Sequence, residues 1–240
     1  MGNATALFLT AWLIYLADRV VDASSLKSGT PRSLRQAFCL RHREIWISAL
    51  VIICGLDSFV IWWSTAAVTL FVGAVVGLLA LIYLVLNHPL GLIWRSLPAK
   101  EIAVGLLFAA GTFVALLPAI PSPPGFVFAA VGFAGLCSLN CISIACWERE
   151  LDREQGKVSI ATRHPEIAGH VRSICLILAL TAFALAIPFP LALPMFVCIG
   201  VSALLLMGLD VSPSLAPDWR TALADLVLLT PLLALIAVKL

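Results

Sequence analysis

Two short stretches of the sequence place acidic side chains one helical turn apart. The segment YLADRVVD puts Asp18 and Asp22 four residues apart, and the segment WERELDREQG puts Glu148 and Asp152 at the same separation. On a helix, residues i and i+4 project from the same face, so each pair presents two carboxylates side by side. Like charges at this spacing repel each other, so each pair needs a positively charged partner.

A hard divalent cation is the partner that this chemistry favours. Mg²⁺ prefers oxygen ligands and commonly bridges a few carboxylates to the phosphates of a substrate. We therefore expect the four paired carboxylates to hold magnesium and, through it, a diphosphate. Basic side chains would neutralise the remaining phosphate charge, and the candidates are Lys100, Arg153 and Lys157. The alternative is a solvated helix end, in which these acids and bases pair with one another and set the membrane topology.

The composition assigns these motifs to a membrane protein. Of the 240 residues, 62% are hydrophobic and 12% are charged. A helix needs about 20 apolar residues to cross about 30 Å of hydrocarbon, and the chain offers many such runs. The sequence therefore predicts one all-α domain over residues 1–240, a multi-pass transmembrane bundle of eight helices around a central lipid-accessible cavity. The expected spans are 3–17, 44–63, 66–87, 101–119, 124–146, 167–187, 190–209 and 220–239.

Basic residues fall in alternate links between these spans. Lysine and arginine occur in the first, third and fifth links, whereas the links WWST, PAIPSPPG and PFP contain none. Basic loops face the cytoplasm, so both acidic motifs are expected on the cytoplasmic side, in a bacterial inner membrane. The third link, NHPLGLIWRSLP, is apolar enough to lie along the interface as a cap, and an ordinary loop is the alternative. The net charge of +2 gives no reason to expect nucleic-acid binding.

The motifs resemble those of the UbiA superfamily of intramembrane prenyltransferases. Its members carry Asn-Asp-x-x-Asp-x-x-x-Asp on an early helix, and DRVVD supplies the last two acids as Asp18 and Asp22. A later family motif reads Asp-x-Glu-x-Asp-x-x-x-Gly. The segment ERELDREQG matches it, with Glu in place of the first Asp, at positions Glu148, Glu150, Asp152 and Gly156.

A third segment extends the resemblance over nearly the whole chain. KEIAVGLLFAAG is similar to the family's cytoplasmic lysine, here Lys100, at the start of the helix that precedes the second motif helix. Spaced glycines follow at Gly105 and Gly111. The order of the three segments along the chain agrees with the family order.

The sequence departs from the family pattern in two places. Ile14 and Tyr15 stand where the family has Asn-Asp, so two oxygen ligands are missing from the first motif. Tyr15 lies one turn from Asp18, where it would bind a phosphate or stack on an allylic cation, or else serve as a packed interface tyrosine. The family usually has nine helices with the first motif on the second. Here the motif closes the first expected span, as if the leading helix were lacking.

The resemblance implies magnesium-dependent transfer of an isoprenyl group from an isoprenyl diphosphate to a hydrophobic acceptor within the bilayer. The diphosphate would lie between the two acidic helix ends, with its tail in the apolar cavity. Magnesium and Lys100 would stabilise the departing diphosphate. The residues expected to contact the substrate are Tyr15, Glu150, Arg153, Lys157 and Asn140.

Three other functions fit parts of the same pattern. The altered first motif suits a non-catalytic relative that binds an isoprenoid or a partner protein. Some family members cyclise the prenyl chain, so a terpene-cyclase-like reaction is a second alternative. A small transporter would use acids within the membrane to carry ions or protons, but here the acids lie at helix ends.

Overall fold

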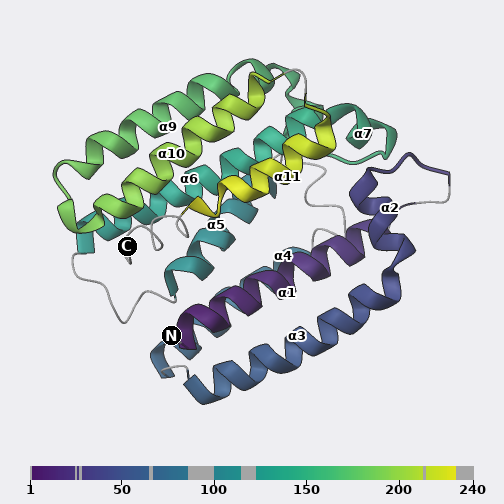
Figure 1. Ribbon diagram of the computed structural model, residues 1–240, viewed down its shortest axis with the longest axis horizontal. Coiled ribbons are helices and arrows are strands. Elements are labelled where there is room, and N and C mark those ends of the chain that lie inside the picture. Colours follow the sequence, from purple (N-terminus) through teal and green to yellow (C-terminus); the bar gives the residue numbers. More distant parts are fainter. Residues whose placement is uncertain are drawn as a thin grey trace. The chain divides into compact units, whose positions relative to one another are not determined.

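The computed structural model describes residues 2–24, 26, 29–64, 67–85, 100–114, 123–212 and 215–230. These residues form helices, turns and loops with no strand among them (Figure 1). The chain divides into two compact units. Unit 1 comprises residues 1–97 and 110–119, and unit 2 comprises residues 98–109 and 120–240. Each unit is described by itself.

Unit 1 is built around two long helices that lie side by side, α1 and α3 (Figure 1). Its elements are α1 (Gly2–Ser24), α2 (Leu34–Arg41), α3 (Arg43–Ser64), α4 (Ala67–Val85) and the last turns of α5 (Lys100–Val114). In the expected membrane interior, Thr10 Oγ1 donates a hydrogen bond of 2.7 Å to Asp57 Oδ2. Because a buried polar group needs a partner in apolar surroundings, this bond ties α1 to α3.

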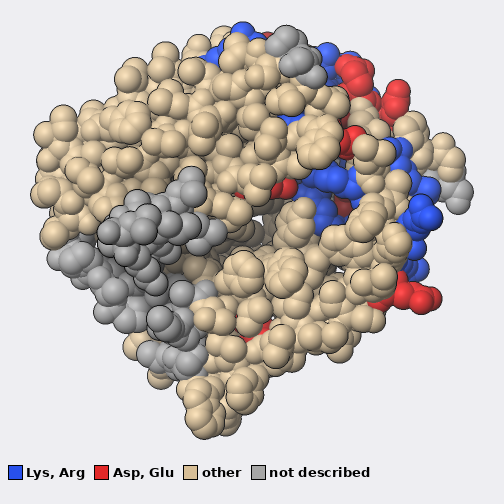
Figure 2. Space-filling view, viewed as in Figure 1, with Lys and Arg blue, Asp and Glu red and all other residues tan. Residues whose placement is uncertain are grey.

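Unit 2 packs α9 against α10 and α6, with α11 against α6 and α10 (Figure 1). Its elements are the first turns of α5, α6 (Pro123–Trp147), α7 (Arg149–Glu154), α8 (Ile160–Arg163), η3 (Pro165–Gly169), α9 (Val171–Ala186), η4 (Pro190–Ala192), α10 (Leu193–Asp210) and α11 (Pro217–Val227). Small buried residues such as Ala179, Ala182 and Ala203 let α9 and α10 approach closely. Most of the visible surface along these two helices is uncharged (Figure 2).

A single carboxylate joins three helix ends in unit 2. Asp210, at the end of α10, accepts a hydrogen bond of 2.9 Å from Trp147 Nε1 at the end of α6. Its second oxygen lies 2.7 Å from Arg172 Nε at the start of α9. Asp210 therefore holds α6, α9 and α10 together at the end of the unit that carries the second acidic motif.

Four helices among the described residues are long and apolar enough to cross a membrane. They are Arg43–Trp63, Ala67–Val85, Pro124–Trp147 and Pro190–Asp210. They coincide with four of the expected spans to within a few residues, and they confirm the prediction of an all-α, multi-pass membrane protein.

The boundaries of other expected spans differ from the prediction. The first helix continues to Ser24, so both acids of its motif lie on continuous helix. The expected span 167–187 is divided into a 3₁₀ helix and α9, which begins at Val171 after the polar residue His170. The last helix begins three residues early because Pro217 occupies its first turn. The ends of spans 101–119 and 220–239 and the link 88–99 lie outside the described residues.

Candidate functional site

The first acidic pair lies in the last turns of α1. Asp18 and Asp22 are both half-buried, and the continuous helix places them on one face, as the spacing predicts. The predicted substrate residue Tyr15 is exposed, and the guanidinium carbon of Arg19 lies 4.9 Å from the centre of its ring. This contact is a cation–π interaction, and it places the positive charge of the Arg19 guanidinium over the Tyr15 ring.

The short helix α2 packs against this end of α1. The Cys39 thiol donates a hydrogen bond of 3.7 Å to the backbone oxygen of Arg19. Burial raises the pKa of the Cys39 thiol, Arg19 lowers it, and Asp22 raises it further. Gln36 Nε2 donates a hydrogen bond of 3.2 Å to Asp22 Oδ2. Two residues of α2, Gln36 and Cys39, therefore lie beside the Asp22 end of the acidic pair, although the sequence predicted no role for them at the site.

The second acidic motif lies where α6 ends. Glu148 is a turn residue with φ −95° and ψ 10°, and α7 begins directly after it. The amide of Asp152 donates to the Glu148 carbonyl oxygen at 2.9 Å, so the two acids keep the predicted one-turn relation across the break. Thr221 Oγ1, on α11, lies 3.1 Å from Glu148 Oε1 and orients this carboxylate.

The glycine of the second motif has a conformational role. Gly156 adopts a φ of +67°, a left-handed conformation that glycine adopts at little cost. Its amide donates to the Arg153 carbonyl oxygen at 3.0 Å, and the Lys157 amide donates to the Asp152 carbonyl oxygen at 2.8 Å. These two bonds form a Schellman motif, which ends α7 and turns Lys157 back toward the helix.

Asp152 is the centre of a charged cluster in unit 2. Burial raises the pKa of its carboxyl, while Lys100, a hydrogen bond from Ser159 and Lys157 lower it. Glu148 raises it. Each of these groups therefore lies within electrostatic reach of Asp152. Four residues that the sequence predicts for the site, from α5, the α6–α7 turn, α7 and the following loop, are brought together here.

Two other predicted residues form a surface ion pair. Glu150 Oε1 lies 3.1 Å from both Arg149 Nη2 and Arg153 Nη1, and its side chain is 68% exposed. Exposed pairs of this kind contribute little to stability, and they match the solvated-helix-end alternative. Asn140 is buried in α6, and among the described residues its Oδ1 has no hydrogen-bond partner. The predicted contacts of Glu150, Arg153 and Asn140 with substrate stay predictions.

A further acid, Glu101, belongs to the same cluster and was missed by the sequence analysis. It is 3% exposed, and its Oε1 accepts a hydrogen bond of 3.1 Å from the Ile160 amide at the start of α8. Its Oε2 is buried, with no hydrogen-bond partner in the described part of the chain. Lys100 and Asp152 both act on it electrostatically. Glu101 therefore fixes the start of α5 to the start of α8.

Two substitutions at Glu101 distinguish the contribution of its hydrogen bond with the Ile160 amide from the contribution of its charge. Glu101→Ala leaves the Ile160 amide without an acceptor and should reduce the free energy of unfolding by about 1–2 kcal/mol. Glu101→Gln keeps a carbonyl oxygen at the same place and should be the more stable of the two variants. Thermal unfolding of the two purified variants in detergent measures the difference. Equal midpoints would contradict a supporting role for the hydrogen bond to Ile160.

The carboxylates suit a hard cation by their chemistry, and each unit contains one pair of them. Within the described ranges, no group of three or more His, Cys, Asp or Glu side chains is gathered as a metal centre. A pair alone is still compatible with Mg²⁺, because this ion usually keeps several waters and completes its shell with phosphate oxygens. In unit 1 the ligands would be Asp18 and Asp22, and in unit 2 they would be Glu148 and Asp152.

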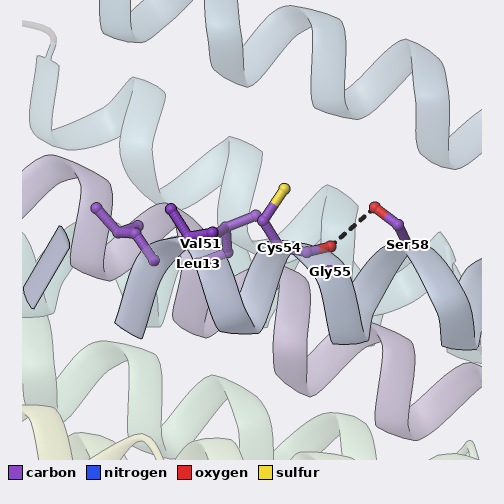
Figure 3. Close-up of a pocket in the computed structure, with 6 residues that line it drawn as sticks. Leu13, Val51, Cys54, Gly55 and Ser58 are labelled. Carbon is purple, nitrogen blue, oxygen red and sulfur yellow. Dashed lines mark hydrogen bonds between the residues drawn. The ribbon is translucent and has the colours of Figure 1, made fainter. Parts of the chain in front are cut away.

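Unit 1 also contains an apolar hollow of about 420 Å³ (Figure 3). It lies along α1 and α3, and the residues that line it are Leu13, Leu50, Val51, Cys54, Gly55 and Ser58. Figure 3 shows the Ser58 hydroxyl turned to its own helix, where it donates to the Cys54 carbonyl oxygen at 2.8 Å. Since this hydroxyl is already used, the hollow offers a surface for hydrocarbon rather than for a polar headgroup.

Comparisons of the chain with protein-family models, with curated proteins and with solved structures give no match. The resemblance to UbiA prenyltransferases therefore stays a prediction. It is carried by the residues quoted for it, of which Lys100, Glu148 and Asp152 lie in one charged cluster.

Proposed function

We propose that this protein is a magnesium-dependent intramembrane prenyltransferase of the UbiA type. It would transfer an isoprenyl group from an isoprenyl diphosphate to a hydrophobic acceptor within the bilayer. The observation that supports this proposal best is the cluster around Asp152. A half-buried carboxylate with a second acid and two lysines in electrostatic reach has the charges that a metal-bound diphosphate requires.

In this proposal Glu148 and Asp152 are metal ligands, and Lys100 binds the diphosphate as it leaves. Magnesium, when bound, would neutralise charge that develops on the departing phosphate oxygens. Lys100 begins the helix that Glu101 anchors, and its positive charge acts on both Glu101 and Asp152 before substrate arrives. Preorganised charge of this kind stabilises a transition state more strongly in a dry, low-dielectric site than in water.

The first acidic pair takes the corresponding role in unit 1. Asp18 and Asp22 would bind a cation, while Arg19, held over the Tyr15 ring, would attract a phosphate oxygen. The arginine thus supplies positive charge next to the position where two oxygen ligands of the family motif are missing. We further propose that both motifs face the cytoplasm of a bacterial inner membrane, as the distribution of lysine and arginine indicates.

The direct test is release of diphosphate from farnesyl or geranylgeranyl diphosphate by the purified protein in detergent or nanodiscs. We expect release with Mg²⁺ and none with EDTA. The isoprenyl group should appear in the lipid phase as a prenylated product when an acceptor is present, and as the free prenyl alcohol, formed with water, when none is. Hydrocarbon products in the absence of any acceptor would instead indicate a cyclase.

Two outcomes would contradict the proposal. Saturable binding of the diphosphate with no turnover under any metal condition would identify a non-catalytic isoprenoid-binding relative, which the replacement of Asn-Asp by Ile14 and Tyr15 favours. Ion or proton flux in proteoliposomes with no diphosphate chemistry would identify a transporter.

A further inference from the structure

Helix α2 brings an amide side chain to the first acidic pair. Gln36 Nε2 lies 3.2 Å from Asp22 Oδ2, although the two residues are fourteen positions apart in the chain. Both residues belong to unit 1, and the contact is made where α2 packs on the end of α1.

The orientation of this amide is fixed from its other end. The side-chain oxygen Gln36 Oε1 accepts a hydrogen bond of 3.0 Å from the Ser33 backbone N–H. In return, the Gln36 backbone N–H donates to Ser33 Oγ at 3.3 Å. These reciprocal bonds form a capping box at the start of α2. The Ser33 backbone N–H is a donor, so it needs the carbonyl end of the Gln36 side chain. The NH₂ end must then face Asp22, because an ionised carboxylate only accepts hydrogen bonds.

We propose that Gln36 is a positioning residue for Asp22. The hydrogen bond that its side-chain NH₂ group donates holds one oxygen of the Asp22 carboxylate in place. A lysine or arginine at this position would compete with the metal for Asp22, whereas the neutral amide orients the carboxylate without cancelling its charge. Ligating carboxylates in metal sites are commonly held by outer hydrogen bonds of this kind. The inference rests on the proposed magnesium chemistry, but the contact between Gln36 and Asp22 does not.

Two variants separate positioning from helix stability. Gln36→Met has a similar length and removes the donor to Asp22 together with half of the capping box. Ser33→Ala removes the hydroxyl that accepts from the Gln36 backbone N–H, but it leaves the hydrogen bond from the Gln36 side chain to Asp22 in place. Both should destabilise α2, and only Gln36→Met should disturb the acidic pair.

The contact itself is tested without reference to activity. In a double-mutant cycle, we expect Gln36→Met to lower the thermal midpoint of the wild-type protein more than it lowers that of Asp22→Ala. Equal shifts in the two backgrounds would show that the amide does not act on Asp22, and the inference would be lost.

The positioning role is tested by titrating Mg²⁺ and following both thermal stabilisation and diphosphate release. We expect Gln36→Met to raise the half-saturating Mg²⁺ concentration about tenfold, and Ser33→Ala to leave it unchanged. An unchanged value for Gln36→Met, beside a responsive wild type, would overturn the inference alone. A wild-type protein that neither binds Mg²⁺ nor releases diphosphate would overturn the proposed function and, with it, this role of Gln36.

Discussion

Asp152→Asn is expected to slow magnesium-dependent diphosphate release by a factor of roughly 10²–10³, the usual cost of removing one electrostatic contact to a transition state. Asparagine has the shape of aspartate and still offers an oxygen to Ser159, which hydrogen-bonds the native carboxylate. The substitution therefore removes the charge while retaining the packing. Initial rates of diphosphate release at saturating Mg²⁺ measure the effect.

The matched control lies on the same short helix. Glu154 is exposed at the end of α7, and Glu154→Gln makes the same acid-to-amide change away from the cluster. This variant should release diphosphate at the wild-type rate. Equal rates for Asp152→Asn, Glu154→Gln and the wild type would remove Asp152 from the proposed chemistry.

A substitution at Lys100, which acts electrostatically on Asp152, gives a second test of the same chemistry. Lys100→Met should be comparably slow, because the ammonium and the metal-bound carboxylate act on the same diphosphate. Residues that act as a unit are strongly non-additive, so the double variant should be little slower than either single variant. Additive losses would mean that the two residues contribute to separate steps.

The membrane helices were the most predictable part of the fold. The hydrocarbon thickness sets a minimum length for an apolar helix, so runs such as 44–63 and 124–146 could be identified without knowing their neighbours. The same local reasoning gave the one-turn relation of Glu148 and Asp152, since it depends only on helical periodicity. It failed at span 167–187, where a 3₁₀ helix ends at Gly169 and α9 begins only after the polar residue His170.

Residues that position the acids were not predictable, because their partners are distant in the chain. The Ile160 amide is 59 residues from Glu101, and Thr221 is 73 residues from Glu148. No local spacing reveals such pairings. The available signals were weaker: an acid directly beside Lys100 at the start of an apolar helix, and a Ser-x-x-Gln capping pattern before α2.

The packing of α5 leads to the second large prediction. A Cβ atom at Gly105 would overlap Ser138 Oγ and lie 2.5 Å from the Ser138 backbone nitrogen on α6. Because a backbone nitrogen has no rotamer to change, α5 would have to move away from α6. Gly105→Ala should therefore reduce the free energy of unfolding by about 3 kcal/mol, near the upper end of the usual cost of overpacking.

Gly111 provides the control within the same helix. A Cβ atom at Gly111 would meet nothing within 4 Å, so Gly111→Ala adds only the better helix propensity of alanine and should not lower the thermal midpoint. Lys100 and Glu101 lie about one turn before Gly105, so displacement of α5 should also move them from Asp152. Gly105→Ala is thus expected to lose diphosphate release together with stability. Equal midpoints for the two alanine variants would show that α5 does not depend on this close approach to α6.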